Sequence, residues 1–362
     1  MVEKKAVDLG DLRNRIDQID QSICLAISER ASLMRDVLEA KKAEGTAAAF
    51  RPEREAQVLR AIGERNPGPL ANEVMTRLFR EIMSACLAQQ VPLKVAYLGP
   101  EGTFTHQAVL KQFGHAVRAL GVATIEDVFT DVEQGHADLG VVPVENSTEG
   151  AVNNTLDMFV SSPLKICGEV DLAIHHNLLS SSDKLSGIER VYAHPQALAQ
   201  CRGWLHEHLP ETERIAVASN AEAARRVQHL SEAAAIASEE AATLYGLNTL
   251  ASRIEDQHDN TTRFLVIGSR MFPASGKDRT SLLLAAHDRA GALYDLLQPL
   301  ARRNVSMTRI ESRPSKRGKW DYVFFVDVLG HAEDEPLRLA IDELRSVASK
   351  VKVLGSYPAA IF

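Results

Sequence analysis

The sequence has 362 residues, which at roughly 150 residues per domain corresponds to two or three domains. Hydrophobic residues make up 45% and charged residues 25%, the balance of an ordinary globular protein. The net charge of −7 disfavours nucleic acid as a partner. No apolar run approaches the roughly 20 residues that cross a bilayer, and the charged N-terminal stretch has no apolar signal core. We therefore expect a cytoplasmic protein without membrane partners.

Four cysteines, Cys24, Cys86, Cys167 and Cys201, are widely spaced and include no Cys-x-x-Cys pair. This spacing indicates neither a disulfide framework nor a zinc site. The sequence also contains no Walker loop, dinucleotide fingerprint or Ser-His-Asp order. We expect free thiols, no metal and no cofactor.

The first quarter of the chain has helical periodicity and no strand pattern. Ile16, Ile19 and Ile23 recur at intervals of three and four, which predicts a helix of over thirty residues. Pro52 marks the start of a second helix, and a third runs from about residue 70 to residue 90. The first helix spans about 50 Å at 1.5 Å per residue, more than two shorter helices cover. We therefore expect it to pack against a second copy of the chain, in a homodimer or a higher homo-oligomer.

Charged residues interrupt the apolar faces of these helices. Arg30 and Lys41 fall in the stripe of the first helix, and Arg51 and Glu55 in that of the second. Because buried unpaired charge is costly, these groups need partners. The spacing alone is consistent with a structural ion network and equally with a pocket for an anionic ligand.

Nearly all of this segment resembles the all-helical chorismate mutases. The matching residues are Leu12-Arg13, Glu29-Arg30, Lys41, Arg51-Pro52-Glu53-Arg54-Glu55 and Phe79-Arg80-Glu81-Ile82-Met83-Ser84-Ala85-Cys86. The resemblance implies an intertwined dimer that converts chorismate to prephenate by a pericyclic rearrangement. Such a step needs no nucleophile or base, so positioning and electrostatics must supply the rate.

The resemblance also implies a role for individual residues. Arg30 is expected to bind one substrate carboxylate, and Arg13 of the partner subunit the other, because the guanidinium fork matches a carboxylate. Lys41 and Gln90 are expected to donate hydrogen bonds to the ether oxygen, and Glu55 to accept one from the ring hydroxyl.

Two further positions are expected to contact the mutase substrate, although they depart from the family pattern. Some members have Asp where Arg51 stands and Ser where Cys86 stands. Many relatives have Glu at the position of Gln90, where it must be protonated to donate. We therefore expect this mutase not to need an acidic pH.

From Lys94 onward, short apolar strands alternate with Ala-rich helices, an α/β pattern in which ligands bind at strand ends. Polar residues that do not titrate gather at these ends: Thr103, Asn146, Ser147, Asn260, Thr261 and Thr262. Each of these residue types also caps helices. Together with Arg263 they suggest an anion site.

Four blocks of this central segment resemble prephenate dehydratase. They are Gly99-Pro100-x-Gly102-Thr103-Phe104-Thr105, Pro143-Val144-Glu145-Asn146-Ser147, His194-Pro195-Gln196-Ala197-Leu198-Ala199-Gln200-Cys201 and Asn260-x-Thr262-Arg263-Phe264. The resemblance implies two α/β lobes, similar to a periplasmic binding protein, with the site in the cleft. It also implies that prephenate loses CO2 and water to give phenylpyruvate.

Aromatisation drives that reaction, so the enzyme mainly has to assist the departing hydroxyl with a proton donor. The resemblance assigns this role to Thr262. Arg263 is expected to orient Thr262 or to bind a substrate carboxylate. The other residues expected to bind the dehydratase substrate are Thr103, Asn146, Ser147, Gln196 and Phe264.

After a linker at residues 271–279, the last segment has the order βαββαβ, which predicts a ferredoxin-like sandwich. Gly291-Ala292-Leu293 lies at the start of its first helix, and Glu311-Ser312-Arg313-Pro314 ends its second strand. Taken alone, these are a glycine turn and an exposed strand end. Together they resemble the phenylalanine-binding ACT domain, which implies that L-phenylalanine binds there and inhibits the dehydratase.

We therefore predict a multidomain protein with an all-α chorismate mutase domain (residues 1–92), a two-lobed α/β dehydratase domain (94–270) and an α+β ACT domain (279–362). The whole chain resembles the bifunctional chorismate mutase/prephenate dehydratases of phenylalanine biosynthesis. Three alternatives remain open at this point: N-terminal helices that serve only as a dimerisation arm, a non-catalytic solute-binding protein, and arogenate as the dehydratase substrate. The sequence does not distinguish a dimer from a tetramer.

Overall fold

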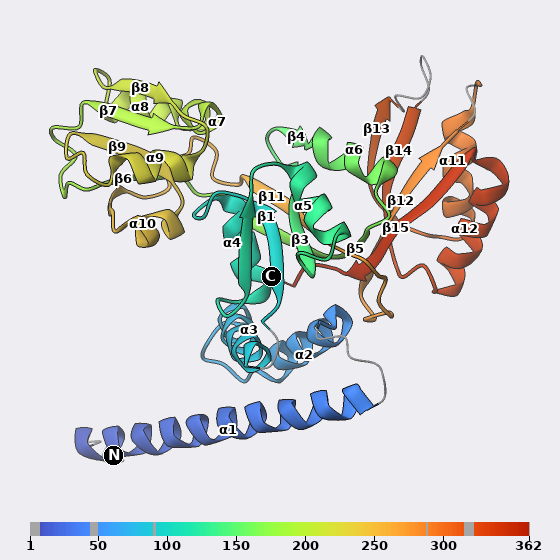
Figure 1. The fold of residues 1–362 in the computed structure, drawn as a ribbon, viewed down its shortest axis with the longest axis horizontal. Coiled ribbons are helices and arrows are strands. Elements are labelled where there is room, and N and C mark those ends of the chain that lie inside the picture. The colour runs from blue at the N-terminus through green and yellow to red at the C-terminus, as the bar shows by residue number, and fades with distance from the viewer. Residues whose placement is uncertain (1–7, 44–49, 90–91, 287–288, 315–321, 362) are drawn as a thin grey trace, which may run out of the picture.

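The computed structural model describes residues 8–43, 50–89, 92–286, 289–314 and 322–361, with the side chains of residues 38 and 41–43 also outside the description. A long N-terminal helix extends along one side of the molecule, and a C-terminal sheet with two helices lies beside a two-lobed α/β region (Figure 1). Among the described residues, no helix is both long and apolar enough to cross a membrane.

The N-terminal region consists of α1 (Leu9–Ala43), α2 (Pro52–Arg65) and α3 (Asn72–Ala88), as the periodicity predicts. Pro52 occupies the first turn of α2, where its fixed φ suits the helix. Helices α2 and α3 pack against each other, and α1 contacts α3. The apolar stripe of α1 is nevertheless exposed, at 55% for Ile16 and 51% for both Ile19 and Ile23. The described residues of a single chain leave these three side chains uncovered.

The first α/β lobe is built on a mixed sheet with the strand order β2-β1-β3-β11-β5, and β4 pairs with β3. Its strands are β1 (Lys94–Leu98), β2 (Arg118–Val122), β3 (Leu139–Asn146), β4 (Gly150–Ala151), β5 (Lys165–Ala173) and β11 (Thr261–Gly268). Its helices are α4 (Phe104–Phe113), α5 (Ile125–Glu133) and α6 (Asn153–Ser161). Apolar cores lie on both faces of the sheet.

The second lobe has a five-stranded sheet with the order β10-β6-β9-β7-β8. Its strands are β6 (Asn177–Ser180), β7 (Arg190–Ala193), β8 (Glu213–Ala216), β9 (Ala233–Ala237) and β10 (Asn248–Ala251). Its helices are α7 (Pro195–Gln200), α8 (Arg202–His208), α9 (Asn220–Val227) and α10 (Glu239–Tyr245). The chain passes between the lobes twice, after β5 and before β11, so a cleft separates two bodies joined by two segments.

The C-terminal region has the predicted βαββαβ order and an antiparallel sheet with the strand order β13-β14-β12-β15. Its elements are β12 (Asp278–Ala285), α11 (Ala292–Arg302), β13 (Met307–Pro314), β14 (Tyr322–Leu329), α12 (Glu335–Val347) and β15 (Lys350–Pro358). Leu282 and Leu284 pack under the two helices, whereas Leu283 joins the core of the first lobe. The sheet is therefore covered on one face by its own helices and on the other by the first α/β lobe.

The approach of this sheet to the first lobe is close at Gly355 of β15. A Cβ atom there would lie 2.0 Å from the backbone oxygen of Ile166 in β5. Only glycine permits that distance, so β15 and β5 are in backbone contact across the boundary between the two regions.

Candidate active site and effector region

A cavity of about 210 Å³ lies between the two α/β lobes. The first lobe and its connections contribute Thr103, Asn146, His176, Asn260 and Thr262, and the second lobe contributes His194, Gln196, Gln200, Ser219, Asn220 and Ser238. Four residues predicted from the sequence, Thr103, Asn146, Gln196 and Thr262, thus line one cavity. Its lining is rich in hydroxyls and amides.

Thr262 lies in β11 opposite Asn146 of β3 and is 9% exposed. The Asn146 amide nitrogen donates to the Thr262 hydroxyl at 2.8 Å and to Asn260 Oδ1 at 2.8 Å. Because the Thr262 oxygen accepts this hydrogen bond, its own proton is available for donation into the cavity. Ser147, also predicted, braces this arrangement: its hydroxyl lies 3.5 Å from Asn260 Oδ1 and accepts from the Thr261 amide at 3.0 Å.

Next to this pair lie His176 and Gln200, which were not predicted from the sequence to be site residues. His176 is 2% exposed, and its Nε2 lies 2.8 Å from Gln200 Oε1, which also accepts from Asn260 at 3.4 Å. Burial lowers the pKa of His176, against a smaller opposing effect of the Gln200 hydrogen bond, which favours a neutral ring. His176, Gln200, Asn260, Asn146 and Thr262 thus form one hydrogen-bonded chain.

Four helices, α4, α7, α9 and α10, begin at residues that line the cavity, and α4 and α9 are the two longest of them. Thr103 caps α4: its hydroxyl accepts from the His106 amide at 3.3 Å and donates to the Pro100 carbonyl at 2.9 Å. Ser219 caps α9 by accepting from the Glu222 amide. Thr103 is therefore both a capping and a cavity residue. Two helix N-termini make the cavity favourable to carboxylates.

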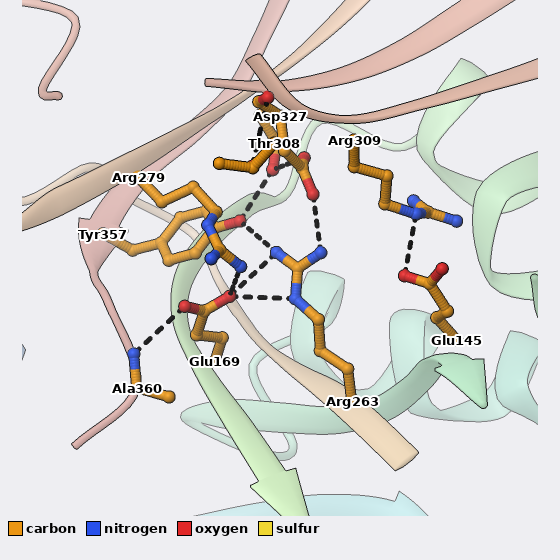
Figure 2. A network of polar contacts seen from close by, with 10 residues as sticks. Glu145, Glu169, Arg263, Arg279, Thr308, Arg309, Asp327, Tyr357 and Ala360 are labelled. Atoms are coloured by element: carbon orange, nitrogen blue, oxygen red, sulfur yellow. Dashed lines mark hydrogen bonds and ion pairs between the residues drawn. The ribbon is translucent and has the colours of Figure 1, made fainter. Parts of the chain in front are cut away.

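Two residues predicted for the cleft, Arg263 and Phe264, do not line the cavity, so we correct their expected contact with the substrate; the other role expected of Arg263, that of orienting Thr262, stays a prediction. Successive residues of a strand face opposite sides, so Arg263 points away from the side of Thr262. Its Nη1 lies 2.6 Å from Asp327 and its Nε 2.9 Å from Glu169 (Figure 2), and it does not line the cavity. Phe264 is 2% exposed and packs in the core of the first lobe. Arg263 is therefore engaged by carboxylates behind the sheet and is not available to bind an anion in the cavity.

The predicted mutase residues do not converge within one chain. Arg13 is exposed near the start of α1, and Arg30 is half-buried 17 residues later, about 25 Å along the axis at 1.5 Å per residue. Arg51 is exposed and pairs with Glu53, and Cys86 is buried in α3. The Lys41 side chain and the whole of Gln90 lie outside the described residues.

Glu55 faces the junction of α2 and α3 with the dehydratase region. It lines a cavity of about 60 Å³ together with Phe50, Arg80 and Phe113, and its Oε1 lies 3.8 Å from Arg80 Nε. Burial raises the pKa of Glu55 to about 7, and the Arg80 charge opposes this rise. Arg80 was part of the motif but was not predicted to be a site residue.

The predicted effector residues lie at one end of the C-terminal sheet. Ala285, Val323 and Arg313 occupy one row across β12, β14 and β13, so β12 and β13 both end at the same edge of the sheet. Gly291 has a φ of 81°, a conformation that favours glycine, and precedes α11. Gly291, Leu293, Ser312 and Pro314 are exposed, whereas Ala292, Glu311 and Arg313 are partly buried. Arg313 also pairs with Asp157 of α6 at 2.7 Å.

A polar cleft between two α/β lobes, attached to a βαββαβ sandwich with an exposed helix-start turn, defines a protein that binds a small polar molecule between its lobes and carries an additional α+β domain. Residues 95–272 match the prephenate dehydratase family, residues 12–91 the type II chorismate mutases and residues 280–346 the ACT domain.

Full-length relatives combine the same three parts. Bifunctional chorismate mutase/prephenate dehydratases of Stutzerimonas stutzeri and Pseudomonas aeruginosa are each 52% identical, over 99% and 98% of both chains respectively. A prephenate dehydratase from Arthrobacter aurescens, solved in complex with L-Phe, is 34% identical with a TM-score of 0.68 and covers 74% of this chain and 90% of its own. The chain belongs to the family of bifunctional chorismate mutase/prephenate dehydratases.

Proposed function

We propose that the helical region rearranges chorismate to prephenate, that the interlobe cavity converts prephenate to phenylpyruvate, and that L-phenylalanine bound to the ACT domain inhibits the second reaction. The observation that carries the dehydratase assignment is the Thr262 hydroxyl, held by Asn146 in a polar cavity between two lobes. The family membership supports both activities together.

In the dehydratase reaction, the bond from the ring to its carboxylate breaks and the electron pair enters the ring, while the bond to the 4-hydroxyl breaks. The oxygen leaves with a proton that the net reaction takes from solvent. Thr262 donates a hydrogen bond to this oxygen, and the bond strengthens as negative charge develops on it. An alcohol is too weak an acid to release its proton fully, so we assign Thr262 to charge stabilisation and proton relay.

Prephenate carries two carboxylates, and the N-termini of α4 and α9 suit them. Gln196 and Asn220 line the same cavity and supply amide donors. A neutral His176 adds no charge to the hydrogen-bonded chain that runs through Gln200 and Asn260 to Thr262. The reaction therefore proceeds by orientation and hydrogen bonding, without a metal or another cofactor in the proposed mechanism.

For the mutase we propose a site shared between two chains. Arg30 and Arg13 of the partner subunit bind the two carboxylates, Lys41 and Gln90 donate to the ether oxygen, and Glu55 accepts from the ring hydroxyl. Arg51 and Cys86 complete the binding site. The distance of about 25 Å between positions 13 and 30 along one helix and the exposed stripe of α1 support a dimer.

We propose domain limits of 1–92, 94–270 and 279–362, with the effector held by Gly291-Ala292-Leu293 and Glu311-Ser312-Arg313-Pro314. The four cysteines are free thiols, which supports a reducing, cytoplasmic location.

Replacing Thr262 by Val tests the dehydratase assignment, because it removes the hydroxyl and preserves the shape. We expect phenylpyruvate formation to fall by about 10²–10⁴-fold, the usual contribution of a positioned proton donor. Thr262→Ser should retain a measurable part of the activity, and the mutase reaction of the same sample should not change. If Thr262→Val forms phenylpyruvate as fast as the unmodified chain, the assignment of Thr262 is wrong.

A further inference from the structure

A second pair of residues lies directly behind the Thr262–Asn146 pair. Arg263 follows Thr262 and Glu145 precedes Asn146, and the two are register partners on β11 and β3. Because side chains alternate along a strand, one pair faces the cavity and its sequence neighbours face the C-terminal sheet. Each cavity residue is therefore joined through one peptide unit to a charged residue on the opposite face.

The charged pair meets a matching charged pair of the ACT sheet. Arg263 Nη1 lies 2.6 Å from Asp327 of β14, and Arg309 Nε of β13 lies 2.9 Å from Glu145 (Figure 2). Arg309 and Asp327 are themselves register partners. Ion pairs thus connect β11 to β14 and β3 to β13, so one register pair of the dehydratase faces one register pair of the ACT sheet.

Burial makes the Arg263–Asp327 contact selective for one arrangement, whereas Glu145 of the second pair is 38% exposed. The side chains of Arg263, Asp327 and Glu169 are 11%, 7% and 1% exposed. Arg263 also donates to Tyr357 at 3.0 Å, and Glu169 also accepts from Arg279 at 2.7 Å. In such a low-dielectric setting, a charge displaced from its partner is costly, so β11 and β14 have to move together, and the Arg309–Glu145 pair adds a second contact between the neighbouring strands.

The effector side of this connection begins on β13. Along that strand, Arg309, Glu311 and Arg313 are partly buried, whereas the residues between them are exposed, so these three share one face. Glu311 and Arg313 belong to the proposed effector site. A shift of β13 on effector binding would therefore reach Glu145 through Arg309, two residues away.

We propose that Arg263 and Glu145 are positioning residues that transmit the state of the ACT domain to Thr262 and Asn146. The inference rests on the proposed function, since it needs both the Thr262 site and inhibition by phenylalanine. Effector binding changes the equilibrium between two positions of the β13–β14 pair, and the ion pairs convert this into a change in the Thr262–Asn146 geometry. The coupling is reciprocal, so a substrate analogue in the cleft should alter the affinity for phenylalanine.

Two variants of the full-length chain test the coupling from the effector side, Asp327→Asn and Arg309→Gln. Each removes one partner charge and leaves Thr262 and Asn146 untouched. We expect phenylalanine to bind by calorimetry with an affinity within about threefold of the unmodified chain. The concentration that half-inhibits phenylpyruvate formation should rise by about 10-fold, within the range of ordinary coupling free energies.

Lys352→Gln is the matched control. Lys352 crosses the same domain boundary, where its amine donates to the carbonyls of Phe159 at 2.8 Å and Ser162 at 2.6 Å, but these lie at the end of α6. Inhibition should change by less than about twofold in this variant. An equal loss of inhibition in Lys352→Gln would mean that any loosening of the boundary suffices, which would overturn the proposal.

Arg263→Gln tests the dehydratase side through the split between kcat and KM. A positioning role predicts a lower kcat with little change in KM for prephenate, whereas a carboxylate-binding role predicts a raised KM. Unaltered inhibition in both Asp327→Asn and Arg309→Gln would overturn the coupling even if Arg263→Gln does not fold. Absence of phenylpyruvate formation by the unmodified chain would instead overturn the proposed function, and this inference with it.

Discussion

Replacing Ile16 and Ile23 of α1 by Gln should separate the two activities of the chain. These side chains are 55% and 51% exposed in the single chain and lie seven residues apart on one stripe. Burying a whole isoleucine side chain contributes about 1.5–3 kcal/mol, so covering the exposed half contributes about 1 kcal/mol. Two substitutions in each of two chains remove about 4 kcal/mol from the dimer, or about 1000-fold in its dissociation constant.

Gln is a good helix former, so α1 itself should persist in the double variant. Leu25→Gln is the matched control, because Leu25 is 65% exposed on the same helix but follows Ile23 by two residues, which places it on the opposite side. It should leave dimerisation and both activities unchanged.

The assay follows chorismate loss and phenylpyruvate formation in one dilution series, with sedimentation velocity on the same samples. In the double variant, mutase turnover should disappear at dilutions where the unmodified chain retains it, because Arg13 of the partner subunit is missing from the site. Conversion of added prephenate should persist. Full mutase activity of the double variant at every dilution would refute the shared site.

Three further predictions follow from the structure. Arg13→Ala and Arg30→Ala chains, each inactive alone, should regain about a quarter of the mutase activity when equal amounts are mixed and allowed to exchange subunits. Half of the dimers are then mixed, and each mixed dimer has one intact site out of two. A mixture that stays inactive would place both residues in the same chain's site. Burial raises the pKa of Glu55 to about 7, so between pH 4.5 and 7 the folded chain keeps a proton that the unfolded chain releases, and stability falls as pH rises through this window. As pH rises from 5 to 8, the melting temperature of Glu55→Gln should therefore increase relative to that of the unmodified chain. A constant difference between the two melting temperatures over this range would contradict the raised pKa of Glu55. Gly355→Ala places a Cβ 2.0 Å from a backbone oxygen of β5, so β15 has to move away. We expect the free energy of unfolding, measured in urea, to fall by about 1–3 kcal/mol and inhibition by phenylalanine to weaken. An unchanged free energy of unfolding would contradict the close contact.

The sequence predicted the order of the three regions because each has its own hydrophobic period. Intervals of three and four predicted α1, and the alternation of strands and helices predicted the βαββαβ order of the last region. The blocks around Thr103, Asn146, Gln196 and Thr262 were also predicted to meet, and they line one cavity.

Other features depend on contacts between distant segments. Arg263 adjoins Thr262 in its motif, but strand alternation turns it toward Asp327, which lies 64 residues later in another domain. His176 has no periodic or motif signal, and its role in the cavity arises only when Gln200 of the second lobe is placed beside it. The proposed pairing of Arg30 with Arg13 of the partner subunit involves a second chain, whose position no pattern within one chain specifies.

The most direct test is to supply the purified chain with chorismate at neutral pH and to follow chorismate loss and phenylpyruvate gain, with and without L-phenylalanine. Both signals should be present, and phenylalanine should suppress the second. Prephenate that accumulates without phenylpyruvate would contradict the role of Thr262. If chorismate is not consumed while added prephenate is, the first three helices serve only as a dimerisation arm.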